Sequence, residues 1–447
     1  MKTKQDILGE VKEKDIELIR FVYTDNDGVI RSYATTADEL ENDLESGHSY
    51  SIAMPFFSVL DTLVTGTRFG CIGEISAVPD PDTFRILPFV PNTAMVICDF
   101  LNKSDHSSCG LCARSLLKAY LSGLEYDVKA AFENEFYLLV RREEGTYAPF
   151  DKSLCFATSG MNAHHDIVIE MIRALRAQGL KVEKYYPEYG QGQVEIVYRY
   201  DDALNAADNQ IFFRETVRGV AQKHGIVASF MPKPFQNLAG SGAHLHLSLF
   251  KDGKNLFYDP EGQYGLSQMA KHFIGGILKH LKAICAFTTA TVNSYKRLVP
   301  HNWASAYVCY GFDNREAAVR VIAGMKGREA VSFNIEIKPV DGSCNPYLAI
   351  LATLAAGIDG INNKIDPGQP ALIDPHEMTE DQRREMRISR LPKTLIEAVE
   401  AFSADPLFKD ILGEVFWDEY IKLKQFAWTQ YIQHVSEWEM EKYVEAF

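Results

Sequence analysis

Two glutamates stand two residues apart in the apolar segment FENEF, at Glu133 and Glu135. In a β-strand, side chains two residues apart point to the same face, so these carboxylates are predicted to lie side by side. Buried like charges repel each other and are costly unless a cation neutralises them. The pair therefore predicts a metal site, with a solvated strand face as the plainer alternative.

Three further strand-like segments carry polar groups of the same kind. They supply Glu188, Glu195, His244, His246, Glu336 and Lys338. Each segment alone is a weak signal, because a histidine on an apolar strand is more often a satisfied core residue. Taken together, five glutamates and a histidine on strands that could line one cavity favour Mg²⁺ or Mn²⁺ over zinc, which prefers cysteine and more histidine.

Three arginines lie near the carboxylate-bearing segments in the sequence, at Arg297, Arg315 and Arg320. Guanidinium groups are suited to clamp carboxylate and phosphate oxygens while metal ions neutralise the remaining charge. The alternative is that they are ordinary surface arginines. No GxxxxGK[ST] loop is present, so any nucleotide is expected to bind by another device.

Composition narrows the class of protein. The 447 residues, 46% of them hydrophobic, are ample for one large domain and a smaller one. A net charge of −14 disfavours nucleic acid or an anionic membrane as the main partner. No apolar run reaches the ~20 residues of a membrane span, and the first residues lack the layout of a signal peptide, so we expect a cytoplasmic protein.

The elements that must position these residues can be read coarsely. The first hundred residues look strand-rich, with a strand at Leu18–Tyr23, a turn at Asp25–Gly28 and a short helix at Ala37–Ser46. The polar stretch Lys103–Ser108 is the best candidate for a linker.

Beyond it, helices alternate with strands, which predicts a mixed or antiparallel sheet. Helical spacing marks Leu116–Leu124 and Asp166–Gln178, and the tail from Pro392 looks helical throughout. Alternation with period two marks the strands Ala131–Val140, Gln193–Tyr198 and His244–Phe250.

The order of these motifs resembles type I glutamine synthetase along nearly the whole chain. The matching segments are FENEF, PEYGQGQVE, MPKP followed by GSGAHLH, NSYKRLVP, DNREAAVR, IEIKPVDGSCNPYL and the helical tail. The resemblance implies an α+β fold, with an N-terminal β-grasp domain at 1–104 and a catalytic α/β domain at 105–447. It also implies ATP as a substrate, two Mg or Mn ions, and a homo-oligomer of two stacked hexameric rings with active sites between subunits.

Carried over residue by residue, the resemblance implies a role for each polar group. One metal ion would be held by Glu135, Glu188 and Glu195, and the other by Glu133, His244 and Glu336. Arg297 would bind the α-carboxylate of glutamate, with the backbone at Gly240 near its amino group. Arg315 and Arg320 would stabilise the transferring phosphate. The nucleotide contacts would be His246, Ser248, Glu183 and Tyr200.

Four departures from the family pattern change the expected function. Trp303 stands where the family carries the glutamate of a flap that helps bind and deprotonate ammonium. The second ammonium-site acid is also missing, because residues 47–53 read GHSYSIA. Lys338 replaces an arginine, which turns a bidentate donor into a point charge. Ser389 occupies the position of the tyrosine that is adenylylated in the family.

These features predict an ATP-dependent ligase that joins glutamate to an organic primary amine through γ-glutamyl phosphate. Trp303 offers an apolar wall and a cation–π face for an alkylammonium. The alternative is an ordinary glutamine synthetase whose ammonium site uses other residues, such as Glu316 or Glu329. A second alternative is a catalytically weak family member that acts in nitrogen sensing. The complete set of predicted metal ligands argues against this alternative.

Overall fold

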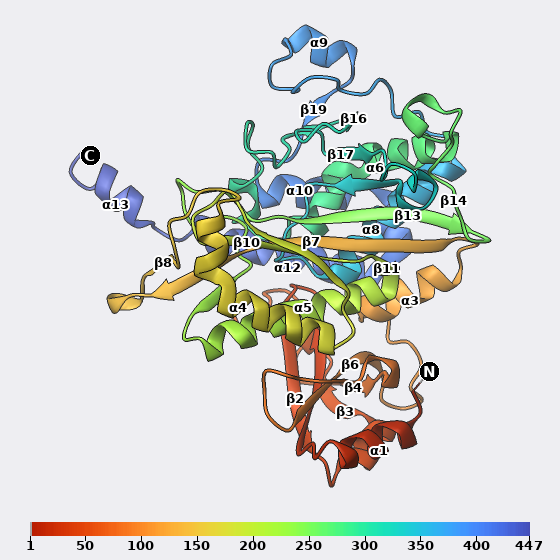
Figure 1. Ribbon diagram of the computed structural model, residues 1–447, viewed down its shortest axis with the longest axis vertical. Helices are drawn as coiled ribbons and strands as arrows, with labels where there is room; N and C mark the ends of the chain where they lie inside the picture. The colour runs from red at the N-terminus through yellow and green to blue at the C-terminus, as the bar shows by residue number, and fades with distance from the viewer. Residues whose placement is uncertain (1) are drawn as a thin grey trace.

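The computed structural model describes residues 2–447 and shows a smaller N-terminal sheet below a larger sheet with its helices (Figure 1). The N-terminal sheet has the strand order β2-β1-β6-β4-β3, and β5 also pairs with β6. Only β1 and β6 run parallel. Its elements are α1 (Lys4–Glu13), β1 (Leu18–Thr24), β2 (Ile30–Thr36), α2 (Leu40–Ser46), β3 (His48–Ser51), β4 (Glu74–Pro79), β5 (Arg85–Ile86) and β6 (Thr93–Asn102).

The predicted hairpin near the N-terminus is confirmed. Strands β1 and β2 pair antiparallel around residues 25–29, and Gly28 adopts the positive φ of +93° that the turn requires. A Cβ at Gly28 would lie 2.3 Å from the carbonyl oxygen of Ser343. The turn therefore packs directly on the loop before helix α8 (Pro346–Asn362). This contact links the N-terminal sheet to the rest of the chain. The predicted helix at Ala37–Ser46 is shorter than expected, because α2 begins at Leu40.

The larger sheet has eleven strands, and its main path is β16-β17-β18-β13-β7-β10-β9. All of its pairings are antiparallel except β16 with β17. This α+β architecture confirms the predicted fold class. Its strands are β7 (Asp127–Arg141), β8 (Tyr147–Pro149), β9 (Val182–Pro187), β10 (Gln193–Tyr198), β11 (Asp201–Asp202), β12 (Val227–Ser229), β13 (Ala243–Lys251), β14 (Lys254–Asn255), β16 (Tyr310–Phe312), β17 (Val319–Ile322) and β18 (Asn334–Ile337).

Strand β7 shows why one face of this sheet is free for chemistry. Phe132, Asn134 and Phe136 are buried on one face, and the Asn134 side chain donates to Gln210 of α5 at 2.8 Å. Glu133 and Glu135 point to the opposite face. Helix α5 therefore covers one side of the sheet, as Figure 1 shows for α4 and α5 below β7 and β10, and leaves the other for the carboxylates.

The remaining helices pack around the larger sheet. Helix α8 is apolar and buried from Pro346 to Ile358, and Asn345 caps it by accepting from the backbone N–H groups of Tyr347 and Leu348. The helices are α3 (Ala113–Ser122), α4 (Thr158–Ala177), α5 (Ala203–Lys223), α6 (Gln268–Thr288), α7 (Glu329–Ser332), α8 (Pro346–Asn362), α9 (Glu380–Glu385), α10 (Leu395–Ala404), α11 (Pro406–Leu412), α12 (Glu414–Ile432) and α13 (Glu437–Tyr443).

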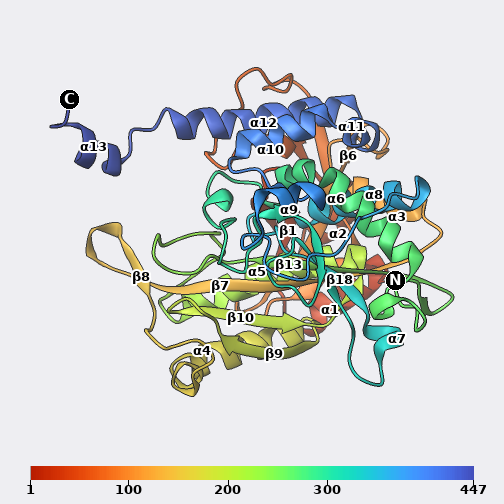
Figure 2. The same cartoon turned by 90° about the horizontal axis from the view of Figure 1, so that it is seen from above.

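The tail is helical as predicted, but it is divided into four helices. Gly413, at a φ of +79°, separates α11 from α12, and residues 433–436 separate α12 from α13. Figures 1 and 2 both show α13 standing away from the body of the molecule. None of the helices in residues 2–447 has both the length and the apolar character needed to cross a bilayer.

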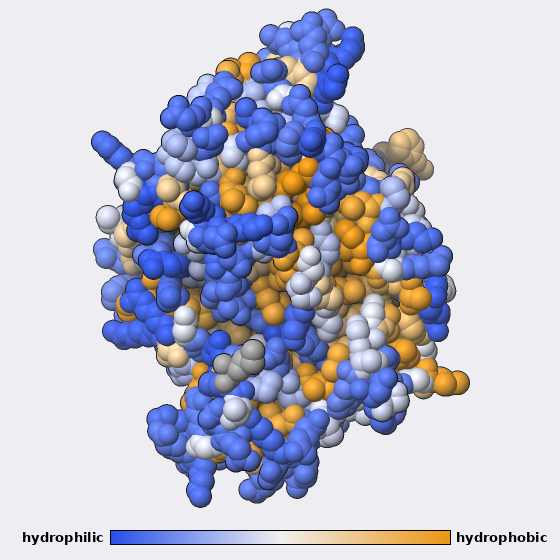
Figure 3. Space-filling view, turned by 90° about the vertical axis from the view of Figure 1, so that its right-hand side faces the viewer, coloured by the Kyte–Doolittle hydropathy of each residue, from blue (hydrophilic) through white to orange (hydrophobic). Residues whose placement is uncertain are grey.

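The face of the molecule drawn in Figure 3 is mostly hydrophilic, with apolar side chains gathered toward one side. Elsewhere, the loop between β3 and β4 exposes several large apolar side chains, with Ile72 87% exposed. The others in this loop are Val59, Leu60 and Leu63. Clustered apolar exposure of this kind is typical of surfaces that contact a partner.

Candidate active site

Strand register places the predicted polar residues in adjacent rows on one face of the larger sheet. Residues directly opposite each other in antiparallel strands share a face, and their Cβ atoms lie about 4.5–5.5 Å apart. Five neighbouring strands contribute, in the order β10, β7, β13, β18 and β17. The cross-strand pairs are Glu195–Glu135, Glu133–His244, His246–Glu336 and Glu336–Arg320.

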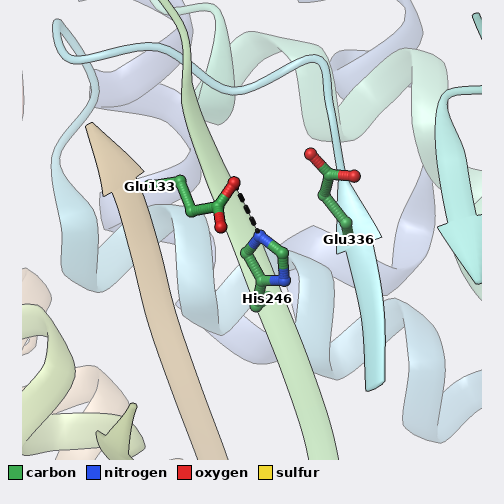
Figure 4. Close-up of side chains that lie close together, drawn as sticks. All are labelled: Glu133, His246 and Glu336. Atoms are coloured by element: carbon green, nitrogen blue, oxygen red, sulfur yellow. Dashed lines mark ion pairs between the residues drawn. The ribbon is translucent and has the colours of Figure 1, made fainter. Parts of the chain in front are cut away.

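Glu133, His246 and Glu336 form a compact group of possible metal ligands (Figure 4). One ligand atom from each lies within 4.8 Å of the other two. The His246 Nε2 atom is buried, lies 3.5 Å from Glu133 Oε2 and makes no hydrogen bond to any of residues 2–447. Burial disfavours a charge on Glu133, but His246 outweighs it and lowers the pKa of Glu133 to about 2. The carboxylate is thus ready to act as an anionic ligand.

His244, rather than His246, was the imidazole expected in this metal site. Its Nδ1 atom lies 3.1 Å from Glu336 Oε1, and its Nε2 atom lies 3.9 Å from Glu135 Oε1. His244 therefore stands between the two predicted metal sites, and both imidazoles lie close to Glu336. The assignment of His244 to the metal and of His246 to the nucleotide stays a prediction.

The second group of carboxylates consists of Glu135, Glu188 and Glu195. Burial, reinforced by the charge of Glu135, raises the pKa of Glu188 to about 7. Burial and the charges of Glu133 and Glu135 raise the pKa of Glu195 well above its ordinary value. Carboxylates held this close resist ionisation together, and a divalent cation that prefers oxygen ligands relieves the repulsion. The donor set therefore fits Mg²⁺ or Mn²⁺.

Two cationic side chains, Arg320 and Lys338, lie next to Glu336. Arg320 Nη1 lies 2.9 Å from Glu336 Oε2, and Lys338 Nζ lies 3.6 Å from Glu336 Oε1. Burial alone would raise the pKa of Glu336, but Lys338 and His244 hold it well below its ordinary value. Positive charge beside a metal-binding carboxylate suits a site that receives phosphate oxygens.

Arg297 is a buried guanidinium, 3% exposed, that forms no ion pair with any described residue. It donates from Nη2 to the carbonyl oxygens of Lys338 and Val340, while its Nε atom is left without a partner in residues 2–447. A Cβ at Gly240 would lie 2.4 Å from Arg297 Cγ, so only glycine fits there. A buried cation with spare donors is suited to bind a carboxylate ligand.

The four predicted nucleotide contacts come from three separate segments of the chain. His246 and Ser248 share a face of β13 with His244, because they are two and four residues further along the strand. Glu183 lies on the edge strand β9 and accepts from Arg199 Nε at 2.7 Å, and Tyr200 is 49% exposed. Within residues 2–447, neither of these two contacts the glutamate cluster through a hydrogen bond or ion pair.

Residues 300–305 form a segment beside the site that is exposed at 301–303 and buried at Ala304 and Ser305. His301, Trp303 and Ser305 all have positive φ, at 61°, 50° and 69°, a conformation that is costly for residues with side chains. The segment is held by Glu316 Oε1, which accepts from the backbone N–H of Trp303 at 2.9 Å, and by the Ser305 hydroxyl, which donates to the Ala317 carbonyl. The Arg315 guanidinium lies 5.8 Å from the centre of the Trp303 indole.

Several residues that organise the site escaped the sequence interpretation. The Tyr186 hydroxyl donates to Glu195, and the Gln193 side chain donates to the Gly240 carbonyl at 2.9 Å. Asn334 Oδ1 lies 2.9 Å from His246 Nδ1. Gln193 and Asn334 lie on two of the strands for which the sequence predicts site residues, two positions before Glu195 and Glu336. Period two was therefore the signal that could have found them.

Comparison with known proteins identifies the class of this site. The family profile "Glutamine synthetase N-terminal domain" matches residues 4–109, and "Glutamine synthetase, catalytic domain" matches residues 110–443. The glutamine synthetase of Halobacterium salinarum is 36% identical over 99% of this chain and 96% of its own length. That of Methanosarcina mazei is 35% identical over 99% and 98%.

Solved structures agree with these relatives. The structure titled "GmaS/ADP complex-Conformation 1" has a TM-score of 0.86 and 30% identity over 98% of this chain and 99% of its own. A "novel glutamine synthase homolog" has a TM-score of 0.84 and 30% identity. The chain belongs to the glutamine synthetase family. It is an ATP-dependent carbon–nitrogen ligase, of a family that uses divalent metal ions.

Proposed function

We propose that this enzyme joins the γ-carboxyl group of glutamate to an organic primary amine, with ammonium as a poor substitute. The observation that carries the proposal is Trp303, which is 63% exposed beside Arg315 at the position where the family has its ammonium-binding glutamate. An indole face attracts an alkylammonium by roughly 0.5–2 kcal/mol and also accommodates its carbon chain. It cannot replace the hydration shell of a small ammonium ion as carboxylates do.

The first half of the reaction, the phosphorylation of glutamate by ATP, would take place on the face of the larger sheet that carries the glutamates. Bound Mg²⁺ or Mn²⁺ would neutralise the phosphate oxygens of ATP, with Glu135, Glu188 and Glu195 as the ligands of one ion and Glu133, Glu336 and a histidine as those of the other. Arg320 and Lys338 are arranged to stabilise the charge that develops on the γ-phosphate as the γ-carboxylate of glutamate attacks it. Arg297, a buried cation with spare donors, would bind the α-carboxylate of glutamate.

The second half of the reaction, the attack of the amine on γ-glutamyl phosphate, would take place beside residues 300–305. An amine held against Trp303 attacks the carbonyl carbon of γ-glutamyl phosphate, the bond from that carbon to the phosphate oxygen breaks, and the amide is released with phosphate. An ordinary glutamine synthetase, with its ammonium site built from Glu316 or Glu329, is the competing function.

Phosphate release from ATP and glutamate across a panel of amines, with ammonium included, tests the proposal. We expect kcat/KM for at least one alkylamine, ethanolamine or polyamine to exceed that for ammonium by more than tenfold. Preference for ammonium over every amine tested would refute the proposal and leave the ordinary synthetase.

We also propose that the chain assembles into a homo-oligomer, a dodecamer of two hexameric rings. Support comes from the exposed apolar side chains of the β3–β4 loop and from residues 301–303, which are open to solvent in the single chain. Size-exclusion chromatography with light scattering should show a particle of at least six 50.3 kDa subunits. A fully active monomer would contradict it.

A further inference from the structure

Glu316 is a buried carboxylate that contacts the segment carrying Trp303. Only 9% of the residue is exposed. Its Oε1 atom accepts the hydrogen bond from the Trp303 backbone, whereas its Oε2 atom has no hydrogen bond or ion pair to any of residues 2–447. Glu316 therefore has one oxygen engaged in holding the loop and one oxygen free for a ligand.

The charges around Glu316 are mixed and come from three different segments. Burial raises the pKa of Glu316, and Asp374, from the loop before α9, adds to this effect. His301, from the 300–305 segment, and Lys338, which follows β18, oppose it. Lys338 also contacts Glu336, so Glu316 lies near the charged groups of the phosphate half of the site. A buried carboxylate whose pKa is raised is a better proton acceptor than an exposed one.

We propose that Glu316 binds the ammonium group of the amine substrate through Oε2 and accepts its proton. The inference rests on the proposed function and deepens it, because it names the residue that makes the amine nucleophilic. Trp303 and Glu316 then form one subsite, in which the indole contacts the carbon chain of the amine and the carboxylate contacts its charged nitrogen.

The proton balance of this step is simple. The bound alkylammonium transfers one proton from nitrogen to Glu316 Oε2 and becomes a neutral amine. Its lone pair forms the C–N bond with the carbonyl carbon of γ-glutamyl phosphate. As the adduct collapses, the C–O bond to phosphate breaks, and the second proton on nitrogen leaves with the phosphate. Glu316 is regenerated when it releases its proton to solvent.

A purely structural role for Glu316, holding Trp303 in its left-handed conformation, is the competing explanation. Glu316→Gln separates the two roles, because the Gln side-chain oxygen still accepts the Trp303 N–H but cannot take a proton. Hydroxylamine separates them further, because it is already uncharged at neutral pH and needs no base before it attacks γ-glutamyl phosphate.

The experiment compares kcat/KM for the preferred alkylamine with kcat/KM for hydroxylamine, in wild type and in Glu316→Gln. General base catalysis contributes about 10²–10⁴-fold, so the alkylamine-to-hydroxylamine ratio should fall at least 100-fold in the variant. Raising the pH toward the pKa of the alkylamine should partly restore the ratio. The matched control is Glu397→Gln, since the exposed Glu397 also accepts a backbone N–H, from Lys393 at 2.8 Å, and its ratio should be unchanged.

Two results would overturn the proposal. A parallel loss with both nucleophiles would show that the substitution disturbs the site as a whole and not proton transfer, and no loss with either nucleophile, which is the result that a purely structural role predicts, would exclude Glu316 as the base. Both results differ from the one that would refute the proposed function, because that refutation is a preference of the wild-type enzyme for ammonium over every amine tested. In that case the same ratio, measured with ammonium in place of the alkylamine, tests Glu316 as the base of an ordinary synthetase.

Discussion

The two halves of the proposed active site are built in different ways. The metal and phosphate half lies on five paired strands, where the register of β10, β7, β13, β18 and β17 sets the position of each side chain. The amine half lies on residues 300–305, a segment with three left-handed residues and few anchors. Sheet positions tolerate little change in geometry, whereas a loop can change its chemistry without disturbing the sheet. This difference would let a member of the family retain its phosphate chemistry while its nitrogen donor changes.

The sheet half should be the more sensitive to mutation. Glu336→Ala should lower ATP turnover by more than about 100-fold, which is the upper end of what loss of an outer partner of a metal site costs. Steady-state phosphate release measures the effect. Normal turnover in this variant would remove Glu336 from the metal site and weaken the contrast between the two halves.

Glu336→Gln is the matched control for folding. Glu336 is buried beside Arg320 and Lys338, so its removal leaves two cations without their partner. The Gln variant keeps the volume and one hydrogen-bond acceptor. It should unfold in a single transition with a Tm closer to wild type than that of the Ala variant, yet lose activity to a similar extent.

Arg297→Lys should have the next largest effect. The substitution retains the positive charge but loses the fork of donors, and hydrogen bonds to charged groups contribute about 1.5–3 kcal/mol. We therefore expect kcat/KM for glutamate to fall roughly 10- to 150-fold, with little change in the KM for ATP. The same substitution at the exposed Arg199 is the control. A change in KM for the amine but not for glutamate would move Arg297 to the other half of the site.

Trp303→Ala should have a smaller effect, confined to the amine. The lost cation–π contact corresponds to an increase in the KM for the preferred amine of about 2- to 30-fold, with glutamate and ATP binding nearly intact. Trp303→Glu should restore little activity with ammonium, because the second acid of the family's ammonium site is missing. Strong gain of ammonium activity in Trp303→Glu would show that a single loop residue sets the choice of nitrogen donor.

The smallest expected effect is a pH dependence of stability in the metal-free protein. The pKa of Glu188 is raised to about 7 from 4.5, so the folded state holds a proton that the unfolded state releases. The associated stability is fully present below pH 4.5 and is lost as the pH rises through about 7. The Tm of chelator-treated protein should fall by a few degrees over this range. Added Mg²⁺ should cancel the fall, and a Tm that rises with pH in the metal-free protein would contradict the crowding of carboxylates.

Much of the sheet half was accessible from the sequence because strand periodicity is local. Alternation put Glu133 and Glu135 on one face and marked β10 at the residues observed. Family resemblance then joined segments that lie far apart in the chain. The predicted helix at Leu116–Leu124 is α3, which begins and ends earlier, because its N-terminus is set by the packing of Ala113 and Arg114 rather than by a capping side chain.

Tertiary structure alone decided how these residues meet. The sequence determined which residues are chemically capable and which face of a strand they share, because those properties depend on near neighbours. It could not determine that His244 lies between two carboxylate groups, that Arg297 is buried with no direct ion pair to any described residue, or that Glu316 reaches back to the Trp303 backbone. Those relations depend on the register of separate strands and on the path of a loop whose left-handed residues are held by tertiary contacts.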